Sequence, residues 1–227
     1  MSPALRDLAE LVRLPAAVTV PGDTLVGLAA GGGPAAPRAW LLPASSLCLY
    51  WAGMALNDWG DRELDALERP ERPVPSGRVR PEEALALAGG LTAAGVAVAG
   101  LAGGRRAVGV AGLLAAAVWT YDLAGKRGPL APVSMSLTRA LDVLLGATAS
   151  RGGTARGLVP ALVVGVHTLG VTDLSRDEVH GSSGSAPVRA QAATASATVG
   201  ALAAAAVTAA GAPGRDARGV PPVVPAL

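Results

Sequence analysis

Long runs without a charged residue dominate this sequence of 227 residues. A hydrocarbon core about 30 Å thick needs roughly 20 apolar residues of helix, and several runs reach that length. Between 84 and 101 nearly every residue is apolar or Gly, so a helix there has no polar face and must be buried in a core or in lipid. Six or seven such runs exceed what one soluble core can cover, which indicates a polytopic membrane protein. The charge-free runs are 24–37, 39–57, 84–104, 107–121, 157–172 and 190–214.

The sequence predicts an all-α membrane helix bundle with about seven transmembrane helices, in a single domain that covers residues 1–227. Ionisable groups inside a span usually face the bundle interior, where they can line a substrate cavity. Three such groups occur, Asp23 in the first span and Arg139 and Asp142 in the fifth. Because Arg139 and Asp142 are i and i+3 neighbours, we expect them to pair with each other. The predicted spans are 11–30, 38–57, 82–102, 106–124, 133–150, 157–175 and 188–211.

Composition excludes several other classes of protein. Apolar residues make up 51% of the chain and charged residues 16%, which is not the composition of a disordered chain. The single cysteine, Cys48, excludes a disulfide scaffold. The net charge is only +2 and no basic stripe stands alone, so we expect no nucleic-acid partner.

The distribution of Lys and Arg predicts an orientation. With seven spans, the N-terminus and the loops 58–81, 125–132 and 176–187 share one side. Together with the span ends next to it, that side carries eleven Lys and Arg residues against seven on the other. The positive-inside rule places the richer side in the cytosol. We therefore expect a multi-pass protein of the inner cell membrane, with its N-terminus and its acidic clusters on the cytosolic side.

An acidic cluster follows the second predicted span. If residues from Asn57 to Asp65 are helical, Asp61 lies about 60° and Asp65 about 20° around the helix axis from Asp58. Carboxylates on one face repel one another unless a cation joins them. Mg²⁺ binds carboxylate oxygens and usually completes its shell with substrate phosphates. The cluster therefore predicts a site for Mg²⁺ and a diphosphate, with Arg62 placed to meet phosphate oxygens. The alternative is a solvated charged loop.

Two linked motifs carry a resemblance to a known family. Residues 57–65 read Asn-Asp-x-x-Asp-x-x-x-Asp, and residues 72–77 read Arg-Pro-x-Pro-Ser-Gly. In this order and at this separation, the motifs resemble those of the UbiA superfamily of intramembrane prenyltransferases. The segments 19–23 and 174–181 resemble its EboC-like branch.

The resemblance implies a second acidic site at the end of the sixth span, where Asp173 and Asp177 hold a second metal ion. The other interpretation of these residues is an ordinary charged helix end. Lys126 and Arg127 in turn have a second interpretation as positive-inside anchors. The residues that the resemblance assigns to substrate binding are Asn57, Arg62, Arg72, Tyr121, Lys126 and Arg127.

The resemblance implies Mg²⁺-dependent transfer of a prenyl group from an allylic prenyl diphosphate to a small acceptor within the membrane. Asp58, Asp61 and Asp65 would be the catalytic, metal-binding residues, while the acceptor and the prenyl length stay open. Two other functions also stay open: a non-catalytic or degenerate protein of this fold, and a polytopic carrier whose acids line an ion path. The family's bundle has nine helices, so seven spans predict a chain that is incomplete at its C-terminus.

Overall fold

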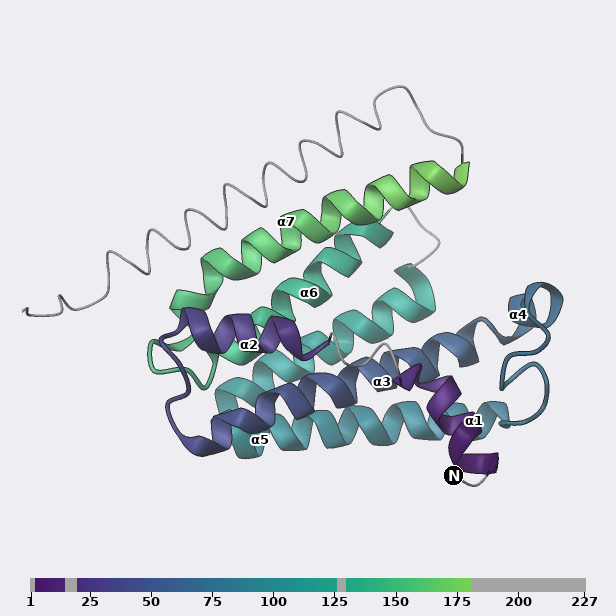
Figure 1. Cartoon of the computed structure of the whole chain (residues 1–227), viewed down its shortest axis with the longest axis horizontal. Coiled ribbons are helices and arrows are strands. Elements are labelled where there is room, and N and C mark those ends of the chain that lie inside the picture. The colour runs from purple at the N-terminus through teal and green to yellow at the C-terminus, as the bar shows by residue number, and fades with distance from the viewer. Residues whose placement is uncertain (1–2, 15–19, 126–129, 181–227) are drawn as a thin grey trace, which may run out of the picture.

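The computed structural model describes residues 3–14, 20–125 and 130–180, and the regular elements in these ranges are helices (Figure 1). This confirms the predicted all-α class. Three helical segments are long and apolar enough to cross a membrane, Pro37–Gly60, Pro81–Ala124 and Gly153–Asp173. The elements are α1 (Pro3–Leu11), α2 (Pro21–Ala30), η2 (Pro37–Leu41), α3 (Leu42–Gly60), α4 (Arg62–Glu68), α5 (Pro81–Thr120), η3 (Tyr121–Gly125), α6 (Ala131–Ala147) and α7 (Gly153–His180).

Prolines stand at the start of most of these helices, including α1 at Pro3 and η2 at Pro37. Pro21, Pro43, Pro81 and Pro132 occupy the first or second position of α2, α3, α5 and α6. A proline lacks the backbone N–H that would have no partner in the first turn, and its fixed φ suits the start of a helix. The helices therefore begin where the sequence allows a sharp start after a loop.

Helix α5 is a hairpin of two helical arms that meet at Gly104 (Figure 1). Gly104 has φ 67° and ψ −154°, a conformation that only glycine adopts readily. The two arms pack side by side, and Trp119 Nε1 on the second arm donates a hydrogen bond of 3.1 Å to Thr92 Oγ1 on the first. The arms correspond to the predicted spans 82–102 and 106–124.

Helices α2 and α6 cross with their backbones in contact. A Cβ atom on Gly27 would collide with the carbonyl oxygen of Val143, and one on Gly146 would collide with that of Thr24. Small residues permit such close approach between membrane helices, where van der Waals packing is the main attraction. The crossing fixes Asp23 of α2 opposite α6.

The first predicted span, 11–30, is wrong at residues 12–14 and 20, which are not α-helical, while 15–19 lie outside the described residues. The structure has α1 end at Leu11 and α2 begin only at Pro21, because a proline suits the start of a helix and not its interior. The predicted spans 38–57, 133–150 and 157–175 correspond to η2 with α3, to α6 and to α7. The predicted span 188–211 lies outside the described residues.

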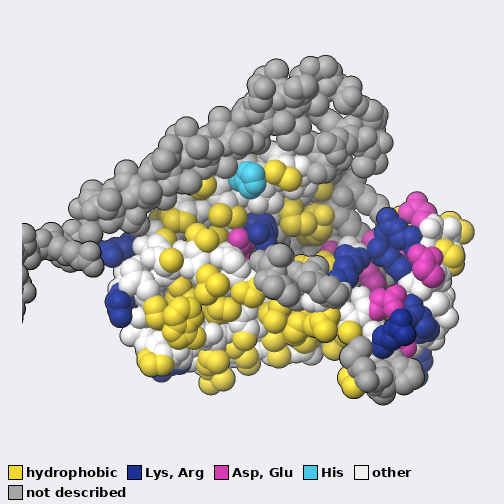
Figure 2. Space-filling view, viewed as in Figure 1, with side chains coloured by type: hydrophobic (Ala, Val, Ile, Leu, Met, Phe, Trp, Pro, Cys, Tyr) yellow, Lys and Arg dark blue, Asp and Glu magenta, His cyan; other side chains and the backbone are white. Residues whose placement is uncertain are grey.

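Charged side chains gather at the end of the bundle where α1 and α4 lie, while the flank of the bundle is largely apolar (Figure 2). Helix α4 and the segment 69–80 project from this end (Figure 1). The exposed apolar side chains on the flank would lie in water if the bundle were soluble, whereas a membrane accommodates them. Examples are Leu25, Leu101, Leu113 and Leu162, each at least 41% exposed.

Candidate functional site

The acidic segment does not form one continuous helix. Helix α3 ends at Gly60, Asp61 has φ −93° and ψ 1°, and α4 starts at Arg62. Glycine is a poor helix former, which permits the break at this point. As a result, the expected single face of three carboxylates is divided, and Asp61 has different surroundings from Asp58 and Asp65.

Asp58 and Asp65 converge on Arg72, the arginine that opens the second motif. Arg72 Nη1 lies 3.3 Å from Asp58 Oδ1 and 2.8 Å from Asp65 Oδ2, and both aspartates are buried, with 3% and 2% exposure. Arg13 adds a second contact of 3.2 Å to Asp58, and Arg69 lies 3.8 Å from Asp65. The two motifs are thus held together by ion pairs, which is a structural reason for their linkage in the sequence.

Helix α1 docks on the segment that carries the second motif. The guanidinium group of Arg78 contacts the carboxylates of Asp7 and Glu10, at 2.6 and 2.8 Å, and donates to the Glu71 carbonyl oxygen. The hydrogen bond from Arg78 lowers the pKa of Glu10, and the two carboxylates raise the pKa of Arg78. This docking places Arg13, which follows α1 in the chain, next to Asp58.

Asp61 lines a polar cavity of about 220 Å³ between the end of α3 and η3. Asp122 of η3 lines the same cavity, is 4% exposed, and accepts a hydrogen bond of 3.3 Å from Asn57 Nδ2. Arg62 also lines it, with its guanidinium group 4.9 Å from the Trp59 ring centroid. The polar cavity therefore combines two carboxylates and a cationic side chain, and the Asn57 amide donates to one of those carboxylates.

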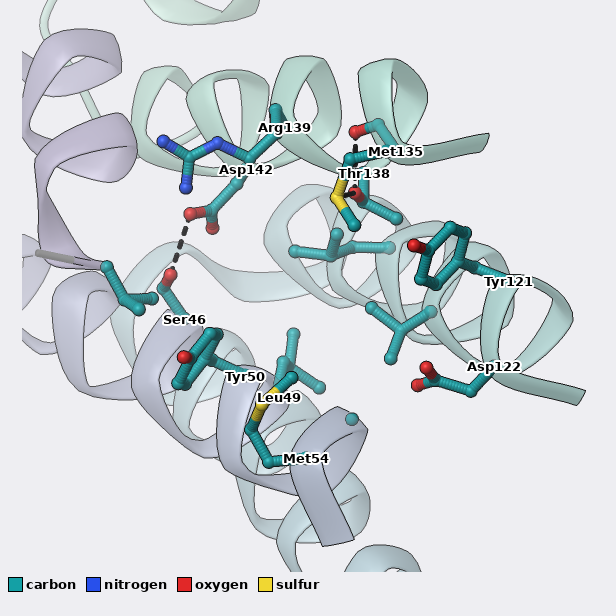
Figure 3. A pocket seen from close by; sticks show the side chains of 14 residues that line it. Ser46, Leu49, Tyr50, Met54, Tyr121, Asp122, Met135, Thr138, Arg139 and Asp142 are labelled. Carbon is teal, nitrogen blue, oxygen red and sulfur yellow. Dashed lines mark hydrogen bonds between the residues drawn. The ribbon is translucent and has the colours of Figure 1, made fainter. Parts of the chain in front are cut away.

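An apolar cavity of about 170 Å³, shown in Figure 3, lies next to the polar cavity. Asp122 lines both cavities and marks where they meet. Leu49, Leu114 and Val118 supply much of the apolar lining, and Tyr121 also faces it. The polar cavity at the end of the bundle thus adjoins an apolar cavity inside the bundle.

Ionisable side chains lie at the deep end of the apolar cavity. The prediction that Arg139 pairs with Asp142 is wrong, because the Arg139 Nε atom lies 2.9 Å from Asp23 Oδ2 across the α2–α6 crossing. Asp142 instead accepts a hydrogen bond of 2.7 Å from Ser46 Oγ (Figure 3). Tertiary contact between helices decides these partners, and sequence spacing does not.

Several predicted site residues are only partly described. Asp173 lies on α7 and is half-buried. Asp177 lies one turn further along α7, and the structure describes its backbone but not its side chain. Lys126 and Arg127 also lie outside the described residues.

Sequence reasoning missed two residues of the site, Asp122 and Arg13. Asp122 meets Asn57 across 65 residues of chain, and Arg13 meets Asp58 across 45. The position of Asp122 in the sequence could have indicated its role. It is an acidic residue at the end of a charge-free run, and it follows Tyr121, which the resemblance assigns to substrate binding.

The polar cavity offers a suitable set of oxygen ligands for Mg²⁺. Within the described ranges, no three His, Cys, Asp or Glu side chains come together as a metal-binding group. Mg²⁺ is, however, usually held in proteins by one or two carboxylates, with waters and substrate phosphates completing its octahedron. The carboxylates of Asp61 and Asp122, with the Asn57 amide beside them, fit that requirement.

Residues 17–225 match the model of the UbiA prenyltransferase family. The chain is 36% identical over 131 residues to digeranylgeranylglyceryl phosphate synthase of Ignicoccus hospitalis, which is 56% of this chain and 43% of that protein. It is 41% identical over 63 residues to 4-hydroxybenzoate octaprenyltransferase of Cupriavidus necator, which is 27% of this chain and 22% of that protein. The chain thus matches less than half the length of these curated relatives.

Two solved structures share the fold. The structure of a UbiA homologue from Aeropyrum pernix superposes with a TM-score of 0.65 at 26% identity, over 88% of this chain and 81% of that one. The structure reported for digeranylgeranylglyceryl phosphate synthase in membranes gives a TM-score of 0.75 at 18% identity, over 91% of this chain and 79% of that one. The helical bundle is therefore the fold of known intramembrane proteins.

Proposed function

Because this chain belongs to the UbiA prenyltransferase family, we propose that it transfers a prenyl group from an allylic prenyl diphosphate to a small acceptor within the membrane. The observation that carries the proposal is the junction of the two cavities at Asp122. A prenyl diphosphate has a highly charged head and an apolar tail, so it needs a polar and an apolar compartment in direct contact. The two compartments in this bundle supply both.

Asp61, Asp122 and Asn57 are the residues that would hold Mg²⁺ in the polar cavity. A bound Mg²⁺ neutralises the charge that develops on the diphosphate as it leaves. Asp58 and Asp65 belong to the same acidic segment, and Arg72 holds them in place. The proposed second metal position at Asp173 and Asp177 rests on the family resemblance.

Cationic side chains complete the proposed diphosphate site. Arg62 lines the polar cavity, whereas Arg72 and Arg13 contact Asp58, the residue that precedes the lining residue Trp59 in the chain. A guanidinium group matches phosphate oxygens with two parallel hydrogen bonds, which fixes the orientation of the head group. Tyr121 at the cavity junction, with Lys126 and Arg127 after it in the chain, extends this site in the proposal.

The apolar cavity protects the reacting carbon from water. Cleavage of the allylic carbon–oxygen bond leaves positive charge on carbon, which water would capture at once. Leu114, Val118 and Met54 line the space next to Asp122, where that carbon would lie. Exclusion of water is a recognised contribution to catalysis when the lining is apolar, as it is here.

The proposed orientation places the N-terminus and the acidic end of the bundle in the cytosol. The charged side chains at that end support it (Figure 2). Soluble prenyl diphosphates made in the cytosol would then reach the polar cavity directly from water.

A pair of variants tests the proposal against a matched control. Asp61→Asn and Asp122→Asn keep the side-chain size but remove a carboxylate, and both should lower Mg²⁺-dependent diphosphate release on the order of 100-fold or more. Glu63→Gln changes an exposed neighbour of Asp61 and should leave release unchanged. The assay uses protein in native membranes with labelled geranyl, farnesyl and geranylgeranyl diphosphates. Release that survives in both aspartate variants would contradict the metal assignment.

A further inference from the structure

The deep end of the apolar cavity holds a polar group that the donor site does not use. Ser46 lies seven residues before Gly53 on α3, so the two differ in depth by about 10 Å. Gly53 lies next to the Asp122 carboxylate, and Ser46 contacts the Asp142 carboxylate. Asp142 therefore lies well inside the bundle, at the far end of the cavity from the polar compartment.

Among the described residues at this depth, Asp142 is the charged group without a charged partner. Arg139 contacts both carboxylate oxygens of Asp23, with Nε at 2.9 Å from Oδ2 and Nη2 at 3.2 Å from Oδ1. Asp142 has the Ser46 hydroxyl on Oδ2, while its Oδ1 is buried without a hydrogen-bond partner. Arg139 thus pairs with Asp23 and not with Asp142, which leaves Asp142 Oδ1, called the open oxygen below, without a partner among the described residues.

This open oxygen needs an explanation. A buried polar atom without a partner costs free energy, and such atoms in native structures usually mark a ligand, a water or a catalytic role. Asp142 is 6% exposed, and it lines the apolar cavity rather than the lipid surface (Figure 3). Among the residues that the structure describes, none donates to this oxygen, so the cavity is the place from which a ligand can reach it.

We propose that Asp142 binds a hydroxyl group of the prenyl acceptor, and that the acceptor is a small uncharged alcohol or polyol. The inference rests on the proposed prenyl transfer and adds the class of its acceptor. Asp142 Oδ1 accepts a hydrogen bond from one hydroxyl at the deep end, and another hydroxyl faces Asp122, where the allylic carbon is released. Transfer forms a carbon–oxygen bond at that second hydroxyl, breaks the bond to diphosphate, and passes the hydroxyl proton to the diphosphate.

The chemistry of the cavity disfavours charged acceptors. A phosphate or carboxylate group would meet the Asp142 carboxylate, and the Arg139 guanidinium group is already engaged by Asp23. An ammonium group brings three N–H donors, which exceeds the one open oxygen of Asp142. A hydroxyl group brings one donor, and the Tyr50 phenol, one turn from Ser46 and also lining the cavity, can donate to its oxygen.

The size of the cavity agrees with a small acceptor. Its whole volume of about 170 Å³ is below the 300–1,000 Å³ that is typical of pockets for larger ligands. Because the reacting end of the prenyl group takes the part next to Asp122, the deep end leaves room for a small acceptor. Its depth of about 10 Å between the levels of Asp122 and Asp142 matches a molecule with hydroxyl groups at two ends.

Fractionation of the acceptor by charge tests the inference without any variant. A small-molecule extract of the native cells is passed over anion and cation exchangers, and each fraction is incubated with the wild-type membrane protein, Mg²⁺ and labelled geranylgeranyl, farnesyl or geranyl diphosphate. Label should enter a new lipid with the unretained, uncharged fraction. An acceptor that either exchanger retains would overturn the inference.

Variants then connect that acceptor to Asp142. Asp142→Leu removes the open oxygen and should raise the amount of uncharged fraction needed for half-maximal rate by roughly 10- to 100-fold, as expected for loss of a hydrogen bond to a charged group. Asp142→Asn keeps a carbonyl oxygen and should recover part of the loss. Ser46→Ala removes the contact that orients Asp142, whereas Ser45→Ala removes only a bond to the Gly95 carbonyl oxygen outside the cavity. The first should weaken acceptor use and the second should not.

The readouts separate this inference from the proposed function. Mg²⁺-dependent binding of the labelled donor should be the same in wild type, Asp142→Leu and Asp142→Asn. If Asp142→Leu transfers label from the uncharged fraction with wild-type half-saturation, the acceptor assignment is wrong while prenyl transfer stands. If the wild-type protein neither binds a donor nor transfers label, both proposals fall together.

Discussion

Replacement of Arg72 by alanine should destabilise the protein because it leaves two buried carboxylates without their shared partner. The side chains of Asp58 and Asp65 are only 5% and 3% exposed, and Arg72 Nη1 lies within 3.3 Å of both. Breaking a buried ion pair by removing one partner costs about 3–5 kcal/mol. Asp58 keeps Arg13 at 3.2 Å, whereas Asp65 keeps only the half-exposed Arg69 at 3.8 Å. The loss should therefore lie at the lower end of that range, about 3 kcal/mol.

Thermal unfolding in detergent, followed by tryptophan fluorescence, measures this loss. A change of about 3 kcal/mol in a chain of this size lowers Tm by about 6–12 °C. The double variant Arg72→Ala, Asp65→Asn should unfold at a higher temperature than Arg72→Ala alone, because it removes the stranded charge. The control Arg69→Ala breaks an exposed i,i+4 pair and should change the stability by less than about 1 kcal/mol. Equal Tm values for wild type and Arg72→Ala, or a double variant less stable than the single one, would refute this reasoning.

Other predictions follow from backbone geometry and from pH. Gly104→Ala should lower stability by about 1–3 kcal/mol through backbone strain, whereas Gly109→Ala, which meets open space in a helix, should raise Tm slightly. Gly146→Ala should push α6 away from α2. A pair of cysteines introduced on the two helices at the crossing should then form a disulfide bond less readily than the same pair in the protein with Gly146. Since the hydrogen bond from Arg78 lowers the pKa of Glu10 below its ordinary 4.5, this contact stabilises α1 docking above that pH and is lost as the pH falls through the lowered value. Hydrogen exchange of α1 should show protection near neutral pH that fades as the pH falls below 4.5, and Arg78→Ala should remove the difference.

The sequence predicted the fold through features that act locally. Charge-free runs define the helices, and Arg105 and Arg106 separate two runs that the structure shows as arms of one hairpin. The motif spacing predicts that Asp58, Asp61 and Arg72 lie at one end of the bundle, and Arg72 contacts Asp58 there. These features depend on neighbours in the chain, which is why one sequence reveals them.

Contacts between distant helices were beyond such reasoning. Asp122 and Asn57 are 65 residues apart, and Arg139 and Asp23 are 116 residues apart. Helical spacing favoured Asp142 as the partner of Arg139, but the glycine-mediated crossing of α2 and α6 brings Asp23 closer. The break at Asp61 was also missed, since Gly60 permits a helix interruption without requiring one.

The most direct test of prenyl transfer is mass analysis of the product. Membranes that contain the wild-type protein are incubated with labelled prenyl diphosphate, native cell extract and Mg²⁺, and the lipids are then extracted. The account predicts one new labelled lipid, heavier than its acceptor by a prenyl group, which EDTA abolishes and which membranes with Asp61→Asn do not form. Absence of any new prenylated lipid, or equal formation with EDTA, would contradict the account.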